Sequence, residues 1–335
     1  ISVSGNGEYY AYSRPGSSYA IRVCKIIPDS QDSYYVLNTC ETLSTYSAFS
    51  SSWTVSDIDL NFDGSAIVVG VSDHDNGDGE AYIWNSGGGN FPFYPDEYFV
   101  YKDVGNVGHR VQISDDGKRV AIVANRYSDT TGNPAVRIYQ HQSDASYKEV
   151  DIIRSEYQMN GFGESIDWSS DGRYVVVGSP DPRYNGANGV VPDSLKKGAV
   201  YVYDCSNSTP DNNSECTQVG DIILGDYEQE WFGWRVAIND TGDLILVSSL
   251  KYPESDSSGE NRNGRVRAYS LSNGSWSPSG YEYIGNEDYS AAGQELDLSA
   301  DGSLGVFSEP YDNSGANRSG TIHVIYADDI SGTSD

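Results

Sequence analysis

The sequence has no long apolar run and almost no methionine. One methionine stands among 335 residues, and no apolar stretch shows a sustained helical period or approaches the length of a membrane span. Abundant instead are glycine (36 residues) and tyrosine (27 residues), together with Ser, Asn and Asp, which are typical of short strands and tight turns. The composition therefore predicts an all-β chain without a membrane span.

Basic residues are scarce. The chain has 21 Lys and Arg against 49 Asp and Glu, which gives a formal net charge of −28. Such a surface repels a phosphate backbone, so nucleic acid is not expected as a partner. The acidity serves either solubility in a salty or calcium-rich medium or a dedicated acidic binding surface.

Cysteine is also scarce, and its four positions form two local pairs, Cys24 with Cys40 and Cys205 with Cys216. Four cysteines allow three pairings, of which the local one suits hairpins with one Cys on each strand. Asn-x-Ser/Thr sequons predict glycosylation at Asn207, Asn212, Asn239, Asn273 and Asn317. These features predict a secreted or cell-surface protein. Because the sequence begins at Ile1, we expect a leader segment to have been removed or left out.

Catalytic signatures are missing. The sequence has neither His-Glu-x-x-His nor Gly-x-Ser-x-Gly, and its histidines stand at unrelated repeat positions, His74, His109, His141 and His323. A nucleophile–histidine enzyme is therefore disfavoured. Paired carboxylates could still support glycoside hydrolase or lyase chemistry, which needs no sequence motif.

Six segments share a Gly-centred turn followed by a β run. They read SVSGNGEYYAYS, DLNFDGSAIVVG, QISDDGKRVAIV, DWSSDGRYVVVG, AINDTGDLILVS and DLSADGSLGVFS. The turn glycines are Gly7, Gly64, Gly117, Gly172, Gly242 and Gly302, so the period runs from 53 to 70 residues. Each period has room for four strands and their loops.

Each unit has a strand before the turn, one after it, a variable loop and a third strand, and most add a fourth. The third strands read YAIRVC, AYIW, VRIY, VYVY, VRAY and IHVIY. Six repeats of four antiparallel strands predict a six-bladed β-propeller, with seven blades as the alternative if absent sequence supplies one. We expect one domain over residues 1–335, with repeats at about 1–52, 53–106, 107–160, 161–230, 231–290 and 291–335, the last without an evident fourth strand.

The segments FGESIDWSSDGRYVVVGSP with GAVYVYD, and FGWRVAINDTGDLILVSS with GRVRAYS, resemble the FG-GAP repeats of integrin α-subunit propellers and of many extracellular proteins. The resemblance implies an extracellular adhesion or recognition propeller, often loaded with calcium. The nearest match to the family's calcium loop is Asp59, Asn61, Asp63 and Gly64, with Ile67 where the family has an acid. The alternative is that Asp and Gly serve only a tight turn.

Aligning the repeats on their turn glycines brings further polar residues into register. Five residues before the glycine, alternate units carry Asp59, Asp167 and Asp297, and two residues earlier stand Asp57, Arg110, Arg235 and Glu295. Because the strand before the turn should be innermost, these side chains are expected to gather near one end of a central channel. They either pair between blades to satisfy buried charge or bind a ligand or cation, since five acids face two arginines.

A second candidate cation site is the segment SDHDNGDGE, with Asp73, Asp75, Asp78 and Glu80 as calcium ligands and His74 among them. An acidic linker is the alternative. The long variable loops should lie opposite the tight turns and join the entries to the inner strands, including residues 157–160 and 230–232. That face would mix aromatics, amides and acids, which suits sugar rings, although ordinary solvated loops have the same composition.

These observations favour non-enzymatic extracellular recognition or adhesion, with a glycan or protein as ligand and Ca²⁺ as an optional cofactor. A carbohydrate-active enzyme, either a lyase or a glycoside hydrolase that uses channel carboxylates, is the alternative from another class. A purely structural surface or matrix module is the third.

Overall fold

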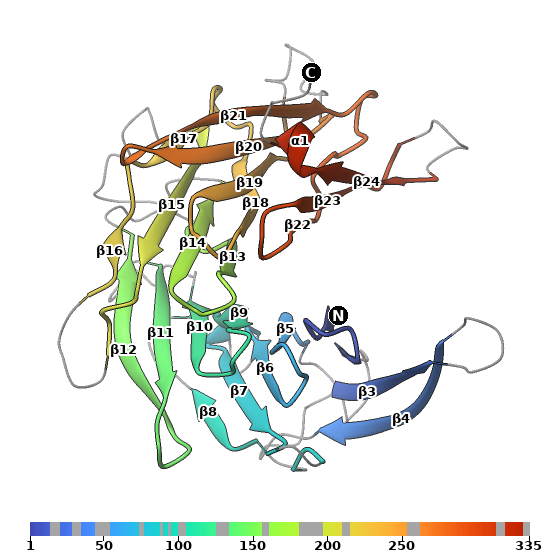
Figure 1. Ribbon diagram of the computed structural model, residues 1–335, viewed down its shortest axis with the longest axis vertical. Helices are drawn as coiled ribbons and strands as arrows, with labels where there is room; N and C mark the ends of the chain where they lie inside the picture. The colour runs from blue at the N-terminus through green and yellow to red at the C-terminus, as the bar shows by residue number, and fades with distance from the viewer. Residues whose placement is uncertain are drawn as a thin grey trace. The chain divides into compact units, whose positions relative to one another are not determined.

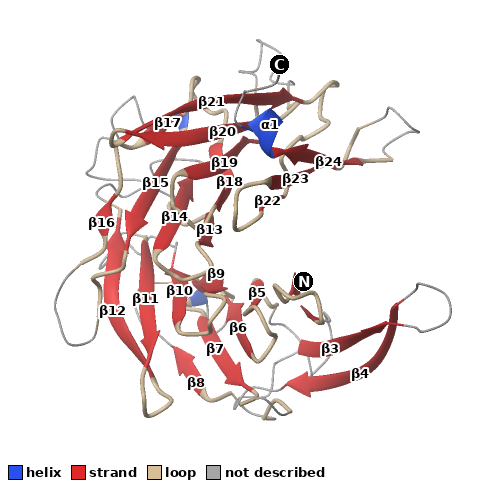
Figure 2. Ribbon diagram, viewed as in Figure 1, coloured by secondary structure: helices blue, strands red, loops and turns tan. Residues whose placement is uncertain are grey.

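The structure, a computed structural model, describes residues 1–13, 21–28, 35–43, 54–73, 77–87, 90–92, 95–99, 105–124, 134–155, 161–180, 197–209, 215–252, 262–312 and 319–330. These residues form six antiparallel sheets whose strands follow chain order (Figure 1). The sheets are the blades of a β-propeller, so the predicted fold class is confirmed. Strands dominate the described residues (Figure 2), among which the one α-helix is α1, Ala327–Ile330.

The chain divides into two compact units. Unit 1 comprises Ile1–Arg154 and Ser208–Glu215, and unit 2 comprises Ser155–Asn207 and Cys216–Asp335. That residues 1–335 form a single domain stays a prediction.

Unit 1 holds the first three blades. Blade 1 has β1 (Ser2–Val3), β2 (Tyr9–Ser13), β3 (Ile21–Pro28) and β4 (Tyr35–Leu43); blade 2 has β5 (Asp57–Leu60), β6 (Ala66–Val71), β7 (Glu80–Asn85) and β8 (Glu97–Phe99); blade 3 has β9 (Val107–Ile113), β10 (Arg119–Ala124), β11 (Ala135–His141) and β12 (Tyr147–Arg154). The second strands of blades 2 and 3 are buried along their whole length, because each blade packs against its neighbour.

Unit 2 holds the last three blades. Blade 4 has β13 (Ser165–Trp168), β14 (Tyr174–Ser179), β15 (Ala199–Asp204) and an outer edge split into β16 (Thr217–Gln218) and β17 (Ile223–Leu224); blade 5 has β18 (Phe232–Ile238), β19 (Leu244–Ser249), β20 (Arg265–Ser272) and β21 (Ser275–Ile284); blade 6 has β22 (Leu296–Leu298), β23 (Leu304–Glu309) and β24 (Thr321–Tyr326). Blade 6 has three strands within the described residues, in agreement with the missing fourth strand in its repeat.

The turns that close the inner hairpins share a side-chain contact in five of the six blades. In blade 2, Asn61 Oδ1 accepts a hydrogen bond from Ala66 N at 2.8 Å, and Asp63 Oδ1 accepts one from Ser65 N at 2.9 Å. The second contact recurs at 2.9 Å from Glu8 N to Asn6, from Lys118 N to Asp116, from Arg173 N to Asp171 and from Ser303 N to Asp301. These contacts explain the Ser/Asn-x-Asp-Gly pattern of the turns.

Two of the turn glycines are required for a second reason. Gly64 has φ +69°, and a Cβ at this position would lie 2.5 Å from Cδ2 of Tyr9 in the preceding blade. Gly242 has φ +68° and meets Tyr174 in the same way, at 2.4 Å. Gly64 and Gly242 therefore serve both the turn and the packing of one blade on the next.

Both predicted disulfides are confirmed. Cys24 and Cys40 are directly paired residues on β3 and β4, and Cys205 is bonded to Cys216 in unit 2. Each bridge lies within one blade, as expected for local pairs. Among the described residues, no helix is long and apolar enough to span a bilayer.

Candidate functional site

The segment that leads into the innermost strand has a residue of positive φ in four blades. The φ angle is 54° at Asn106, 117° at Gly161, 60° at Trp231 and 58° at Ala291. Asn and Gly adopt this conformation at little cost, whereas a bulky side chain is rarely found there. Trp231 is therefore an exception in a backbone conformation that recurs from blade to blade.

The backbone next to this position is fixed by a bridge to the preceding blade. Gly79 pairs with Val107, Gly198 with Phe232 and Gly264 with Ala292, each as an isolated parallel bridge. A Cβ at Gly198 would lie 2.3 Å from the carbonyl oxygen of Phe232, so this close approach requires glycine. Because the bridge forms equally at Ala292, it does not depend on large side chains in the entry segment.

Trp231 belongs to a stack that also contains Trp234, Arg235 and Lys251, referred to below as the tryptophan cluster. The indole centroids lie 5.3 Å apart with an interplanar angle of 18°. Lys251 Nζ lies 3.5 Å from the Trp231 centroid, and Arg235 Cζ lies 5.0 Å from that of Trp234. Both tryptophans are half-buried, and the ring nitrogen of Trp234 is itself buried. The cations hold the rings in place and add hydrogen-bond donors beside them.

A buried ion network supports the loop that carries Trp231. Glu230 is fully buried, with Oε1 accepting from Asp226 N at 2.6 Å and Oε2 accepting from Nη2 of Arg265 at 2.9 Å. The Arg265 guanidinium also lies 3.9 Å from the ring centroid of Tyr252. Burial raises the pKa of Glu230 to about 7, against the opposing effect of Arg265. The network therefore fixes the loop of Trp231 from its buried side.

Sequence reasoning placed residues 230–232 on an aromatic, sugar-suited face but missed Trp234 and Lys251. A signal was present, because the position of Trp231 is filled by small or turn-forming residues in the other entry segments, namely Asn106, Gly161 and Ala291. An alignment on the positive-φ glycines Gly108, Gly163, Gly233 and Gly293 reveals it.

The predicted cluster of acids and arginines divides between the units. In unit 1, Asp59 Oδ2 accepts from Ile113 N of blade 3 at 2.9 Å, and Asp59 Oδ1 accepts from Ser2 Oγ of blade 1 at 3.2 Å and from Leu60 N at 3.0 Å. Burial raises the pKa of Asp59 to about 7. This carboxylate links the first strands of three consecutive blades.

Asp57 has a similar place on β5. Its Oδ2 accepts from Val111 N at 3.1 Å, and burial raises its pKa, opposed first by the charge of Arg110. Both acids of β5 therefore bond to the backbone of β9, a contact that the sequence alignment did not anticipate.

In unit 2, Asp167 repeats the contact of Asp59, with Oδ2 accepting from Ile238 N at 2.8 Å. Arg235 forms a bidentate pair with Glu295 at 2.8 and 2.9 Å, which is the predicted pairing of neighbouring blades. Asp297 is exposed and accepts from Leu298 N at 2.8 Å. Ligand binding by Asp57, Asp59, Arg110, Asp167, Arg235, Glu295 and Asp297 stays a prediction.

The acidic segment after β6 is only partly described, since His74 and Asp75 lie outside the described residues. The Asp73 carboxylate accepts a hydrogen bond from Thr54 Oγ1 at 2.8 Å, and the backbone carbonyl of Asp78 accepts one from Val107 N. The Glu80 carboxylate accepts one from the hydroxyl of Tyr82. Within the described part of the chain, no three His, Cys, Asp or Glu side chains are grouped as metal ligands. Calcium at this segment, or at Asp59, Asn61 and Asp63, stays a prediction.

The sequons differ in accessibility. Asn207 and Asn273 are exposed, whereas Asn239 is 5 % exposed and its Nδ2 donates to Thr241 Oγ1 and to Asp243 Oδ1. Asn212 and Asn317 lie outside the described residues. Glycosylation at each stays a prediction.

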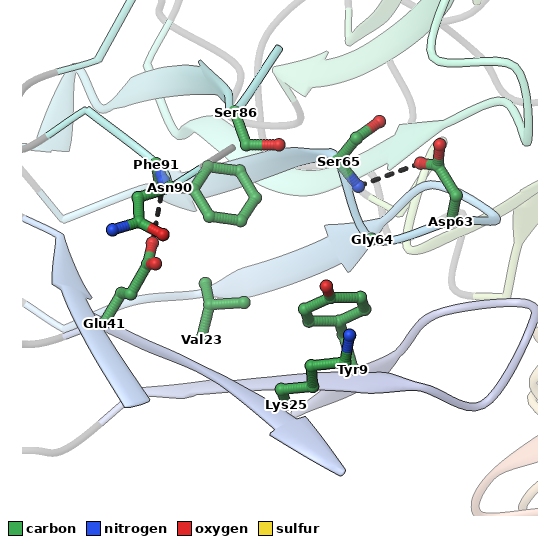
Figure 3. A pocket seen from close by; sticks show the side chains of 10 residues that line it. All are labelled: Tyr9, Val23, Lys25, Glu41, Asp63, Gly64, Ser65, Ser86, Asn90 and Phe91. Carbon is green, nitrogen blue, oxygen red and sulfur yellow. Dashed lines mark hydrogen bonds between the residues drawn. The ribbon is translucent and has the colours of Figure 1, made fainter. Parts of the chain in front are cut away.

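A pocket of about 390 Å³ lies between blades 1 and 2, beside the turn of blade 2 (Figure 3). Tyr9, Val23 and Phe91 supply apolar surface, and the other labelled residues are mostly polar or charged. The sequence analysis did not predict this pocket, because its walls come from segments of two repeats.

No family model matches the chain, and no curated protein matches it. Solved structures of similar fold include hydrazine synthase of Kuenenia stuttgartiensis (13% identity, TM-score 0.58, covering 97% of this chain and 82% of that one). A periplasmic gluconolactonase of Pseudomonas aeruginosa has 14% identity and a TM-score of 0.53 over 89% and 74% of the two chains. A functionally unknown protein of Desulfotomaculum acetoxidans has 11% identity and a TM-score of 0.57 over 97% and 87%. At these identities the likeness shows the propeller fold and no shared activity.

Proposed function

We propose that this protein is an extracellular or periplasmic recognition propeller that binds glycans through the tryptophan cluster of blade 5. The observation that carries the proposal is Trp231, an indole held at φ 60° where other blades place Asn106, Gly161 or Ala291. A bulky residue in this conformation costs of the order of 1 kcal/mol or more, and such cost is met mainly at functional sites.

The chemistry of the cluster suits carbohydrate. The two half-buried tryptophans offer apolar surface to the C–H groups of a sugar ring, and the side chains of Lys251 and Arg235 offer donors to its hydroxyls. Tyr227, 42% exposed, adds a ring 5.8 Å from that of Tyr252. The loop is fixed by the Glu230–Arg265 network, so little ordering is needed on binding.

Membership of the FG-GAP type is part of the proposal. An apolar residue followed by a positive-φ glycine stands at Val107-Gly108, Phe162-Gly163, Phe232-Gly233 and Ala292-Gly293. Three of these apolar residues bridge to a glycine just before the third strand of the preceding blade. The pattern extends the Phe-Gly resemblance from two repeats to four. The two disulfides support an oxidising compartment.

The test is binding to a glycan array and to soluble neutral and acidic polysaccharides in native gels. We expect retardation of the wild type on at least one polysaccharide and about tenfold weaker binding for Trp234→Ala, since loss of one aromatic contact costs roughly 1.4 kcal/mol. The matched control is Gln294→Ala, at the same position in blade 6. Equal binding by Trp234→Ala and wild type would refute the proposed site.

The enzymatic alternative has less support. Asp57, Asp59 and Asp167 would be its catalytic carboxylates, but each accepts a backbone hydrogen bond from the next blade. We therefore expect no release of reducing ends or unsaturated products from the polysaccharide that is bound.

A further inference from the structure

We propose that the pocket between blades 1 and 2 binds a carboxylate-bearing sugar, a uronate, whose carboxylate pairs with Lys25. This site lies in unit 1, whereas the tryptophan cluster lies in unit 2. The inference therefore goes beyond the proposed function and does not rest on it.

The pocket has the size and lining of a ligand site. Its volume of about 390 Å³ falls within the range of roughly 300–1,000 Å³ that is usual for small-molecule sites. Figure 3 shows the Phe91 ring on one side and Tyr9 and Val23 on the other, with Ser86 and Asn90 beside Phe91. Apolar surface surrounded by hydroxyl and amide groups suits a sugar ring.

The two carboxylates of the pocket already have structural partners. Glu41 Oε2 accepts from Phe91 N at 2.7 Å and so ties blade 1 to blade 2. Asp63 Oδ1 accepts from Ser65 N at 2.9 Å and from Asn61 Nδ2 at 3.0 Å, and hydrogen bonds from Ser65 hold its pKa below the usual value. Each keeps a second oxygen that can accept from a sugar hydroxyl.

Lys25 is the charged group that distinguishes this pocket. Its Nζ lies 5.4 Å from the ring centroid of Tyr9, and within the described residues it makes no hydrogen bond or ion pair. Lys25 is the single Lys or Arg among the residues that line the pocket, and no carboxylate of the described residues is its partner. An anionic group on the ligand would supply that partner, in a charge-assisted hydrogen bond.

The aromatic wall of the pocket has a counterpart in blade 5. In blade 5, Leu271 N bonds to Asp243 O as Ser86 N bonds to Ser65 O in blade 2. The neighbour of Leu271 across the hairpin is Trp276, which packs over Gly220 and donates its Nε1 to Val219 O at 2.8 Å. Trp276 thus follows Leu271 by five residues as Phe91 follows Ser86, and each ring packs against the core of its own pair of blades.

The Cys24–Cys40 disulfide holds the wall that carries Lys25. Val23 is paired with Glu41, and Lys25 follows Cys24 on the same strand. The bridge therefore fixes three lining residues relative to one another, which reduces the cost of ordering the site on binding.

The experiment compares glucuronate with glucose, which lacks the carboxylate, by isothermal titration calorimetry. Measurement at 0.15 M salt limits repulsion from distant acids, because the Debye length is then about 8 Å. We expect the wild type to bind glucuronate at least tenfold more tightly than glucose, and Lys25→Met to lose this preference. Lys118→Met is the matched control, since Lys118 is exposed and pairs with Asp116 in a turn of the same unit.

A second variant, Ser86→Trp, places an indole in the pocket and should abolish binding of both sugars while the melting temperature stays near that of the wild type. Equal affinity for the two sugars, no binding of either, or a preference that survives in Lys25→Met or Ser86→Trp would each overturn the proposal. None of these outcomes bears on polysaccharide binding by Trp234→Ala, so failure of one site is distinguishable from failure of the other.

Discussion

Asp59 of blade 2 accepts a hydrogen bond from the backbone N–H of Ile113 in blade 3, through Oδ2 at 2.9 Å. Asp167 of blade 4 accepts the equivalent hydrogen bond from Ile238 N of blade 5. These aspartates, aligned from sequence as candidates for a ligand site, serve first to join the inner strands of adjacent blades.

The stability of the protein should therefore rise as the pH falls from about 7 toward 4. The folded-state pKa of Asp59 is raised to about 7, and an unfolded Asp has a pKa near 3.9, so only the folded state binds the proton in this interval. The raised pKa of Glu230, also about 7, acts in the same direction. Each pKa unit corresponds to about 1.4 kcal/mol, so the combined gain is of the order of a few kcal/mol.

Melting temperatures measured from pH 8 to pH 5 check this expectation. Asp59→Asn should flatten the pH dependence, because it removes the titrating group and leaves an acceptor for Ile113. Asp144→Asn, in an exposed turn, should leave the pH dependence unchanged. A stability that falls steadily from pH 8 to pH 5 would contradict the raised pKa values of Asp59 and Glu230.

The described glycosylation sequons should differ in glycan occupancy. Asn273, at an exposed hairpin turn, and Asn207 can carry a glycan, whereas Asn239 cannot without losing the hydrogen bonds that close the turn of blade 5. Site-resolved mass spectrometry of protein secreted from a glycosylating host should find Asn239 unmodified. High occupancy at Asn239 together with a native fold would contradict the turn geometry.

The two disulfides should differ in their effect on the pocket. Replacing Cys24 and Cys40 together by Ser should cost about 2–4 kcal/mol and also weaken glucuronate binding, because the bridge holds the strands of Val23, Lys25 and Glu41. The double Ser variant of Cys205 and Cys216 should lose comparable stability with glucuronate affinity intact. Similar glucuronate affinities in both variants would show that the Cys24–Cys40 bridge is not needed for the pocket.

Much of the fold could be predicted from the sequence because each blade repeats its own local chemistry. The turn at Asp63-Gly64 and the strand pair joined by Cys24 and Cys40 depend on contacts between residues close in the chain. The recurrence of Asp59, Asp167 and Asp297 in alternate repeats was also visible in the sequence. The groups that donate hydrogen bonds to these carboxylates were not. Because a lone sequence does not show which N–H meets a carboxylate across a blade interface, Ile113 and Ile238 could not be named.

The candidate sites were less predictable for the same reason. The pocket between blades 1 and 2 needs Lys25 and Glu41 from one repeat and Phe91 from the next, and no local pattern links them. Trp231 was visible as an aromatic in an entry loop, but its significance comes from its φ angle, which depends on the bridge between Gly198 and Phe232.

The most direct measurement of the central claim combines stability and glycan binding for Trp231→Asn, which installs the residue that blade 3 has at this position, Asn106. If the indole is present for binding, the stability of the variant should lie within about 1 kcal/mol of that of the wild type, because the relief of positive φ by Asn offsets the lost contacts with Trp234 and Lys251. Its polysaccharide binding should fall by about tenfold or more. A variant that melts several degrees lower and binds like the wild type would show that Trp231 serves the fold, and the proposed glycan site would be wrong.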